Sequence, residues 1–230
     1  MREVQGRQQH SDAAERVDGL RRLRKAFVHA LAGLVQQTRE IMPDHWWHRY
    51  REQLAAWIRA AAEKLLTYVQ PGRTPTLRQY LAIRPADGGM LLAAMWCEIA
   101  EQCVTPDWNT PLVQGLLHSF SACGYLANDL AAGPDETFTA VAALVRTADL
   151  SPRDARQRAQ SLLSAEEQRF WWAHTALRDS DESRPHHRTG LLRATTRFAL
   201  HLDRFRLALH EWTGASSRYA SAGDQSPGPT

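Results

Sequence analysis

Apolar side chains recur at intervals of three and four residues in two long stretches of this chain. In the first stretch they fall at offsets 0, 3, 4, 7 and 11, at Leu54, Trp57, Ile58, Ala61 and Leu65. In the second the steps are 4, 3, 4 and 3, through Phe198, Leu202, Phe205, Leu209 and Trp212. This period marks one face of an α-helix, whereas a half-buried strand alternates at every second residue. The spacing therefore predicts an all-α chain.

Stretches rich in Pro and Gly separate the helical segments, because both residues end helices. They are QPGRTP at 70–75, TPDWNTP at 105–111, GPD at 133–135 and DLSPRDA at 149–155, where Ser151 can cap a helix that has Pro152 at its first position. We expect helices over residues 13–41, 45–69, 76–83, 88–104, 110–131, 136–148, 152–179 and 189–212. A chain of 230 residues without repeats predicts one helical domain over 1–219, followed by a disordered Ser/Gly/Pro-rich tail at 220–230.

The composition limits the kinds of partner that the chain is expected to bind and the cell compartment in which we expect it. The 28 Lys and Arg residues against 25 Asp and Glu give a formal charge of +3, and the basic residues are spread along the chain, which does not favour a nucleic-acid binder. Cys97, Cys103 and Cys123 are odd in number and have no CxxC spacing, so they indicate thiols in a reducing compartment. No apolar run approaches the roughly 20 residues that span a bilayer, and the N-terminus is too polar for a signal peptide. We therefore expect a cytoplasmic protein without a membrane span.

The stretch NDLAAGPDE, residues 128–136, has two interpretations. On a continuous helix Asn128, Ala132 and Glu136 would stack on one face, and Asn128 and Glu136 could then point at one cation. Magnesium suits such a pair, since it takes oxygen ligands and relies on one or two carboxylates plus substrate phosphates. In the other interpretation the helix ends here, and Gly133 and Pro134 terminate it.

Two further stretches carry groups that suit a diphosphate. In YLAIRPADGG, residues 80–89, Arg84 precedes a helix break marked by Gly88, so its guanidinium could bind a diphosphate bidentately and the freed backbone groups could face a ligand. The alternative is a plain turn between two helices with Arg84 in solvent. Arg218 and Tyr219 follow the last helix, where in isolation they would be a frayed end.

Taken together and in this order, these stretches resemble the class I terpene synthases (terpenoid cyclases) of bacteria. In that family a magnesium motif, N-D-x-x-S-x-x-x-E, lies on a late helix. Asn128, Asp129 and Glu136 match it, while Ala132 stands in the place of the Ser. The resemblance implies that Asn128 and Glu136 are magnesium ligands.

The other two motifs of the family concern the substrate diphosphate. Arg84, Asp87 and Gly88 match the Arg-x-x-(Asp/Ser/Thr)-Gly element as diphosphate sensor, linker and effector, which implies a part in catalysis for all three. Arg218 and Tyr219 match a C-terminal Arg-Tyr pair, so the resemblance implies that they contact the diphosphate together with Arg84. The similarity extends from about Trp46 to Tyr219.

The resemblance also implies a fold and a reaction. The fold would be the class I terpenoid-synthase helical bundle. The reaction would be that of a lyase, in which magnesium assists the ionisation of an isoprenyl diphosphate and the carbocation then cyclises in a dry pocket lined by aromatic rings. Farnesyl diphosphate, the precursor of sesquiterpenes, is the expected substrate because fifteen-carbon substrates are common among bacterial relatives.

The chain departs from the family pattern in its acidic residues. No aspartate-rich D-D-x-x-D/E motif occurs in it, and SDAAERVD at 11–18 lacks paired aspartates. Judged by the spacing to Arg84 and Asn128, the motif would lie shortly before Met1, so we expect an N-terminally incomplete bundle that is weak or inactive as this chain. Asp135 also adds a carboxylate that opposes a diphosphate. The alternative is a noncatalytic helical partner or binding protein, acting as a homodimer or with a complementing chain.

Overall fold

The structure is a computed structural model, and it describes residues 25–26, 28–30, 32–102, 104–105, 108–182 and 189–215. The chain divides into two compact units, residues 1–44 and 45–230. In the first unit residues 32–41 are helical. The segment SDAAERVD and the tail predicted at 220–230 lie outside the described residues.

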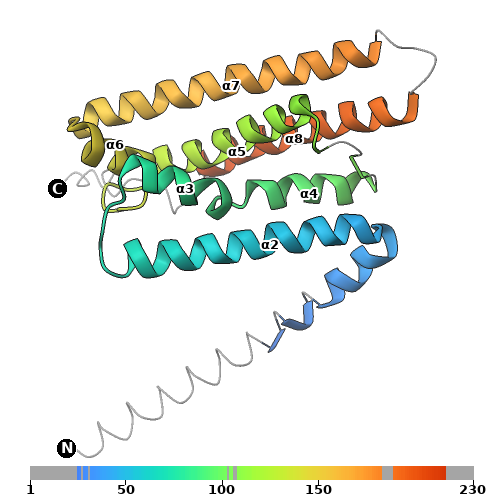
Figure 1. Ribbon diagram of the computed structural model, residues 1–230, viewed down its shortest axis with the longest axis horizontal. Helices are drawn as coiled ribbons and strands as arrows, with labels where there is room; N and C mark the ends of the chain where they lie inside the picture. Colours follow the sequence, from blue (N-terminus) through green and yellow to red (C-terminus); the bar gives the residue numbers. More distant parts are fainter. Residues whose placement is uncertain are drawn as a thin grey trace, which may run out of the picture. The chain divides into compact units, whose positions relative to one another are not determined.

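Helices make up all the regular structure of the described residues, which confirms the all-α prediction (Figure 1). In chain order they are α2 (Asp44–Lys64) with a π-helical extension η1 (Leu65–Val69), α3 (Leu77–Asp87), α4 (Met90–Glu101), α5 (Pro111–Ala131), α6 (Ala140–Ala148), α7 (Pro152–Glu182) and α8 (Thr189–Ala215). No helix among them is long and apolar enough to cross a membrane.

Most boundaries agree with the predicted ranges because local capping signals determine them. The Ser151 hydroxyl accepts a hydrogen bond from the Asp154 amide, so Ser151 caps α7 as predicted. Two predicted ends are wrong by four residues, more than any other predicted end within the described residues. α3 continues through Pro85 to Asp87 instead of ending at 83, and the helix predicted from 136 begins at Ala140, where the Thr139 side chain caps it.

α5 is the central helix of the second unit. It packs against α3, α4, α6, α7 and α8, and its buried side chains belong to two apolar clusters, one toward α3 and α6 and one toward α4 and α8. Leu116 and Phe120 are fully buried in the second cluster, where each such side chain contributes about 1.5–3 kcal/mol. α5 therefore fixes the position of the side chains at its carboxyl end.

A buried carboxylate joins α4 to its surroundings. Glu98 on α4 is 1% exposed. Its Oε2 accepts hydrogen bonds from Trp46 Nε1 at 2.8 Å and Arg49 Nη2 at 2.5 Å, and its Oε1 accepts from the Thr105 amide at 2.8 Å and Trp108 Nε1 at 2.9 Å. The charge is thus paired with Arg49 and fully hydrogen-bonded, as a buried charge requires.

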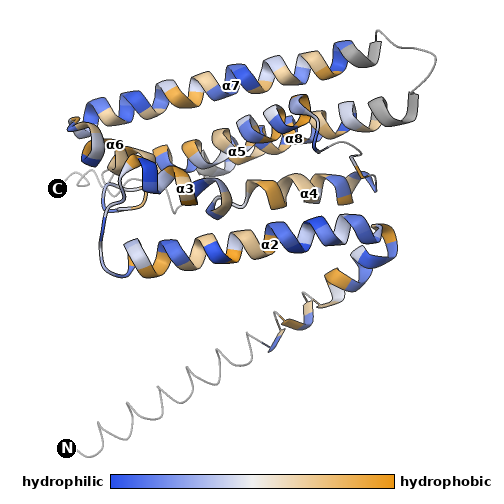
Figure 2. Cartoon of the chain, viewed as in Figure 1, coloured by the Kyte–Doolittle hydropathy of each residue, from blue (hydrophilic) through white to orange (hydrophobic). Residues whose placement is uncertain are grey.

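Residues 54–65 are helical as predicted, but their apolar face is only partly buried. Trp57, Ile58 and Leu65 are 38%, 54% and 45% exposed, whereas Phe198 and Leu202 of the second predicted face lie in the core. Apolar residues therefore lie at the surface of the C-terminal half of α2 and of η1, and Figure 2 shows the hydropathy along both.

Replacement of Glu98 by Ala should lower the free energy of unfolding by about 3 kcal/mol, because it leaves the partly buried Arg49 without its counter-charge and removes the acceptor of two indole N–H groups and the Thr105 amide. Chemical denaturation followed by circular dichroism measures this loss. The matched control is Glu101→Ala on the same helix, where the ion pairs with Arg197 and His201 lie near the surface and the loss should be about 1 kcal/mol or less. Equal losses in the two variants would contradict the central role of Glu98.

Candidate functional site at the carboxyl end of α5

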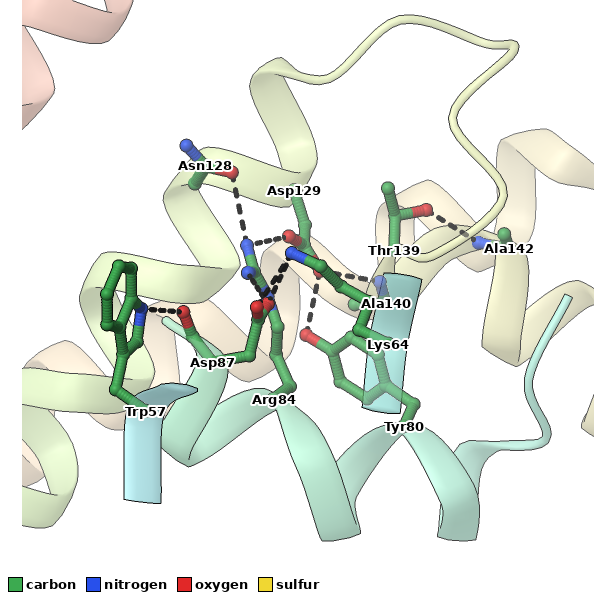
Figure 3. A network of polar contacts seen from close by, with 10 residues as sticks. All are labelled: Trp57, Lys64, Tyr80, Arg84, Asp87, Asn128, Asp129, Thr139, Ala140 and Ala142. Atoms are coloured by element: carbon green, nitrogen blue, oxygen red, sulfur yellow. Dashed lines mark hydrogen bonds and ion pairs between the residues drawn. The ribbon is translucent and has the colours of Figure 1, made fainter. Parts of the chain in front are cut away.

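Arg84 is buried against the carboxyl end of α5 (Figure 3). It lies on α3 and is 8% exposed, so the interpretation that places it in solvent is wrong. Its Nη1 donates to Asp87 Oδ2 at 2.9 Å, and its Nη2 donates to Asn128 Oδ1 at 3.1 Å and Asp129 Oδ1 at 2.5 Å. The structure thereby brings together residues from the two motif stretches 80–89 and 128–136.

Asp129 is the most heavily bonded member of this group. The carboxylate is 3% exposed, and besides Arg84 it binds the Tyr80 hydroxyl and the Ala140 amide, each donating to Oδ2 at 2.8 Å. Burial raises the pKa of Asp129, and the contacts with Arg84, Tyr80 and the Ala140 amide counteract part of that rise. Asp129 thus joins α3, α5 and the first residue of α6.

The groups around Arg84 keep its guanidinium positively charged. Burial by itself lowers the pKa of the guanidinium, but the field of Asp129, followed by those of Tyr80 and Asp87, raises it above the usual value. The pKa of the Tyr80 hydroxyl is also raised, first by burial and then by Asp129. Arg84 therefore remains a cation and Tyr80 a neutral donor throughout the physiological pH range.

Asp87 is shared between two cations. Besides Arg84, it binds Lys64 of α2, whose Nζ lies 2.7 Å from Oδ1 and donates to Oδ2 at 2.8 Å. The Asp87 side chain is buried, whereas that of Lys64 is 29% exposed. The Asp87 backbone carbonyl accepts a hydrogen bond from Trp57 Nε1 at 3.1 Å, so this carbonyl, freed by the end of α3, binds α2 in this conformation and does not face a ligand.

The break between α3 and α4 depends on two glycines. Gly89 has φ of +68°, a left-handed conformation that glycine adopts without steric cost. At Gly88 a Cβ atom would lie 3.2 Å from the Arg84 carbonyl oxygen and 3.3 Å from the Tyr125 Cβ. Gly88 thus allows α3 to approach α5 closely enough for Arg84 to reach Asp129.

The carboxyl end of α5 decides between the two interpretations of residues 128–136. α5 ends at Ala131, and Ala132 has extended backbone angles, with ψ of 148°. Continuing the helix would require the amide of residue 134 to donate to the Leu130 carbonyl, but Pro134 has no N–H. That carbonyl instead accepts from Arg156 Nη2 of α7 at 2.6 Å. The helix end is therefore the interpretation that the structure supports.

Glu136 consequently does not stack two turns beyond Asn128. It lies on the exposed loop between α5 and α6, where its amide donates to the Gly133 carbonyl at 3.2 Å. Ala132 offers no side-chain oxygen, and Asn128 Oδ1 accepts from Arg84. In this conformation the oxygens at the end of α5 do not fit a complete magnesium site. The described part of the chain also has no group of three or more His, Cys, Asp and Glu residues that could hold a metal.

Several participants were not found from the sequence. Lys64, Tyr80 and Trp57 belong to no motif, although Tyr80 lies one helical turn before Arg84 and on the same face. Arg218 and Tyr219 lie outside the described residues, so their roles remain predictions. The metal-ligand roles of Asn128 and Glu136 remain predictions as well.

Two adjacent residues of α5 should respond very differently to truncation. Asp129→Ala should lower the free energy of unfolding by about 3 kcal/mol, because it leaves Arg84 buried without its main counter-charge. Asn128→Ala removes one hydrogen-bond acceptor and should cost about 1 kcal/mol. Denaturant unfolding of the two variants measures the difference. A loss in Asp129→Ala no larger than that in Asn128→Ala would contradict the assignment of Asp129 as the structural centre of the site.

Comparison with known proteins identifies the family. A family model described as "Terpene synthase family 2, C-terminal metal binding" matches residues 2–169, well over half of the chain. No curated protein matches the sequence.

Solved structures agree on the fold. The chain is similar to linalool/nerolidol synthase from Streptomyces clavuligerus in complex with 2-fluorogeranyl diphosphate, with a TM-score of 0.70 and 18% identity over 80% of this chain and 64% of the other. Germacradien-4-ol synthase from Streptomyces citricolor gives a TM-score of 0.72 and 18% identity over 82% of this chain and 61% of the other.

Wild-type cucumene synthase gives a TM-score of 0.64 and 21% identity over 82% of this chain and 64% of the other. The chain therefore spans less than two thirds of the length of these structural relatives. At such low identities the likeness shows the fold, which is the helical fold of class I terpene synthases. Together with the family match it shows that the chain belongs to terpene synthase family 2, the family with a C-terminal metal-binding region.

Proposed function

We propose that the chain is a class I terpene synthase-like protein. The reaction assigned to its site is the magnesium-dependent ionisation and cyclisation of an isoprenyl diphosphate, with farnesyl diphosphate as substrate, and this chain by itself is weak or inactive in that reaction. One observation carries the proposal. The guanidinium of Arg84, the predicted diphosphate sensor, contacts Asp87 of its own motif and Asn128 and Asp129 of the predicted metal motif.

The same observation supports the assignment of weak or no activity. Two buried carboxylates, Asp87 and Asp129, hold the Arg84 guanidinium, so a diphosphate would have to compete with both for it. Breaking a buried ion pair is costly because each partner is left without a counter-charge. The available oxygens do not complete a magnesium site in this conformation. Binding energy would therefore be spent on opening the site before any bond of the substrate could ionise.

The purified 230-residue chain incubated with farnesyl diphosphate and magnesium should form terpene hydrocarbons at a rate at least about 10²-fold below that of a full-length relative, because Arg84 is not available to the diphosphate. Gas chromatography of the extracted products measures the rate. Germacradien-4-ol synthase under the same conditions is the matched positive control. Product formation by the chain at the rate of the control would overturn the weak or inactive assignment.

A noncatalytic role as a helical partner is the second candidate, and the surface of α2 and its extension η1 favours it. Residues Ile58, Ala62, Leu65, Leu66 and Val69 form an apolar stripe at helical spacing, and all five are exposed. Contiguous exposed apolar patches mark sites of protein association. A homodimer joined through this stripe would cover it on both copies, and a complementing chain would cover it on one.

Sedimentation velocity tests the stripe. The chain should sediment as a dimer at micromolar concentration, and Leu66→Glu should shift it to the monomer because a buried charge would face the apolar stripe of the second copy. Trp172→Glu on α7 is the matched control, since Trp172 is also exposed but lies outside the stripe. A wild-type chain that remains monomeric, or a dimer that Leu66→Glu leaves intact, would contradict self-association through α2.

A further inference from the structure

We propose that Arg84, assisted by Lys64, occupies the place of a divalent cation among the oxygens at the carboxyl end of α5. The inference deepens the proposed function and rests on it for the identity of the metal motif. Its consequence is a binding property: magnesium does not bind at Asn128 in this chain.

The charges of the group balance without a metal ion. Asp87 and Asp129 supply two negative charges, and Lys64 and Arg84 supply two positive charges in direct contact with them. A divalent cation would add two positive charges next to a buried guanidinium, and like charges at contact distance in a poorly solvated site repel each other strongly. The group therefore has no electrostatic need for magnesium.

The oxygen atoms of the group are already bonded. Asn128 Oδ1, the oxygen that the motif assigns to the metal, accepts from Arg84 Nη2 at 3.1 Å. Asp129 Oδ1 accepts from the same nitrogen, and Asp129 Oδ2 accepts from Tyr80 and from the Ala140 amide. A magnesium ion that used the second lone pair of Asn128 Oδ1 would lie beside the Arg84 guanidinium, and the two cations would repel each other.

The shape of the guanidinium explains how one side chain can fill this place. Its nitrogens lie in one plane and point their hydrogens outward, so one group can bind oxygens from several directions. In this structure Nη1 binds Asp87 of α3 and Nη2 binds two residues of α5. Arg84 thus gathers oxygens from two helices, as a cation would.

The end of α5 also leaves the last motif residue off the helix. Because α5 stops at Ala131, Glu136 is carried onto the loop, and the third position of the motif is Ala132, which has no donor oxygen. A site with Ala132 in place of a serine and Glu136 off the helix holds a metal ion less well, and the buried Asp129 then needs another positive charge beside it.

Thermal unfolding of the full chain tests this inference without substrate or turnover. The unfolding midpoint is measured by circular dichroism in EDTA and in millimolar magnesium chloride, for the wild type and for Asn128→Ala. The expected result is the same magnesium response in both chains, because Asn128 is not a magnesium ligand. A stabilisation of the wild type by magnesium that Asn128→Ala loses would overturn the inference.

Arg84→Gln provides the converse experiment. Removing the guanidinium leaves the oxygens of Asp87, Asn128 and Asp129 without their shared donor, so this variant should gain a magnesium-dependent rise of its unfolding midpoint that the wild type lacks. Arg156→Gln is the matched control, with no gain expected, because the guanidinium that it removes lies at the same end of α5 but donates to the Leu130 carbonyl. A folded Arg84→Gln variant whose midpoint does not respond to magnesium would show that Arg84 does not take the place of a cation. If Arg84→Gln does not fold, the comparison with Asn128→Ala decides.

These outcomes are separable from those of the product assay. Cyclisation at the rate of the full-length control would refute the weak or inactive assignment, whatever magnesium does to stability. A magnesium response that depends on Asn128 would refute the internal cation, even if no terpene is formed.

Discussion

A buried ion pair between Arg84 and Asp129 organises one end of the helical unit. The two side chains come from helices whose pairing residues are 45 positions apart in the sequence, and both are almost completely removed from solvent. Buried charges are tolerated only when they are paired and hydrogen-bonded, so each depends on the other. Tyr80 and the Ala140 amide complete the shell of Asp129. The positions of α3, α5 and the start of α6 are thereby linked through a single carboxylate.

The length of α5 is the second constraint, because it determines which residues of the metal motif lie on one helical face. Pro134 removes the donor that would extend the helix, and Arg156 of α7 takes the carbonyl that the helix leaves open. A helix five residues longer would place Glu136 on the same face as Asn128. In the shorter helix Glu136 lies on the following loop, and the oxygens of Asn128 and Asp129 are bonded to a guanidinium.

Polar side chains of α2 bind the rest of the unit at three places along the helix. Trp46 and Arg49 bind Glu98, Trp57 binds the Asp87 carbonyl, and Lys64 binds the Asp87 carboxylate. Its apolar stripe around Leu66 remains exposed. Polar contacts to buried acceptors thus set the register of α2, while its apolar surface is available for association.

The sequence by itself determined the helices, because the spacing of apolar residues and the breakers that separate them are local signals. The capping of α7 by Ser151 and the order of the motifs around Arg84 and Asn128 could also be read from it, and the motifs were sufficient to indicate the family. Tertiary structure alone decided that Arg84 is buried, that Lys64 and Tyr80 join its group, and that Arg156 of α7 binds the Leu130 carbonyl at the end of α5. These outcomes depend on contacts between residues far apart in the chain, which form only when the helices pack and for which no local pattern exists.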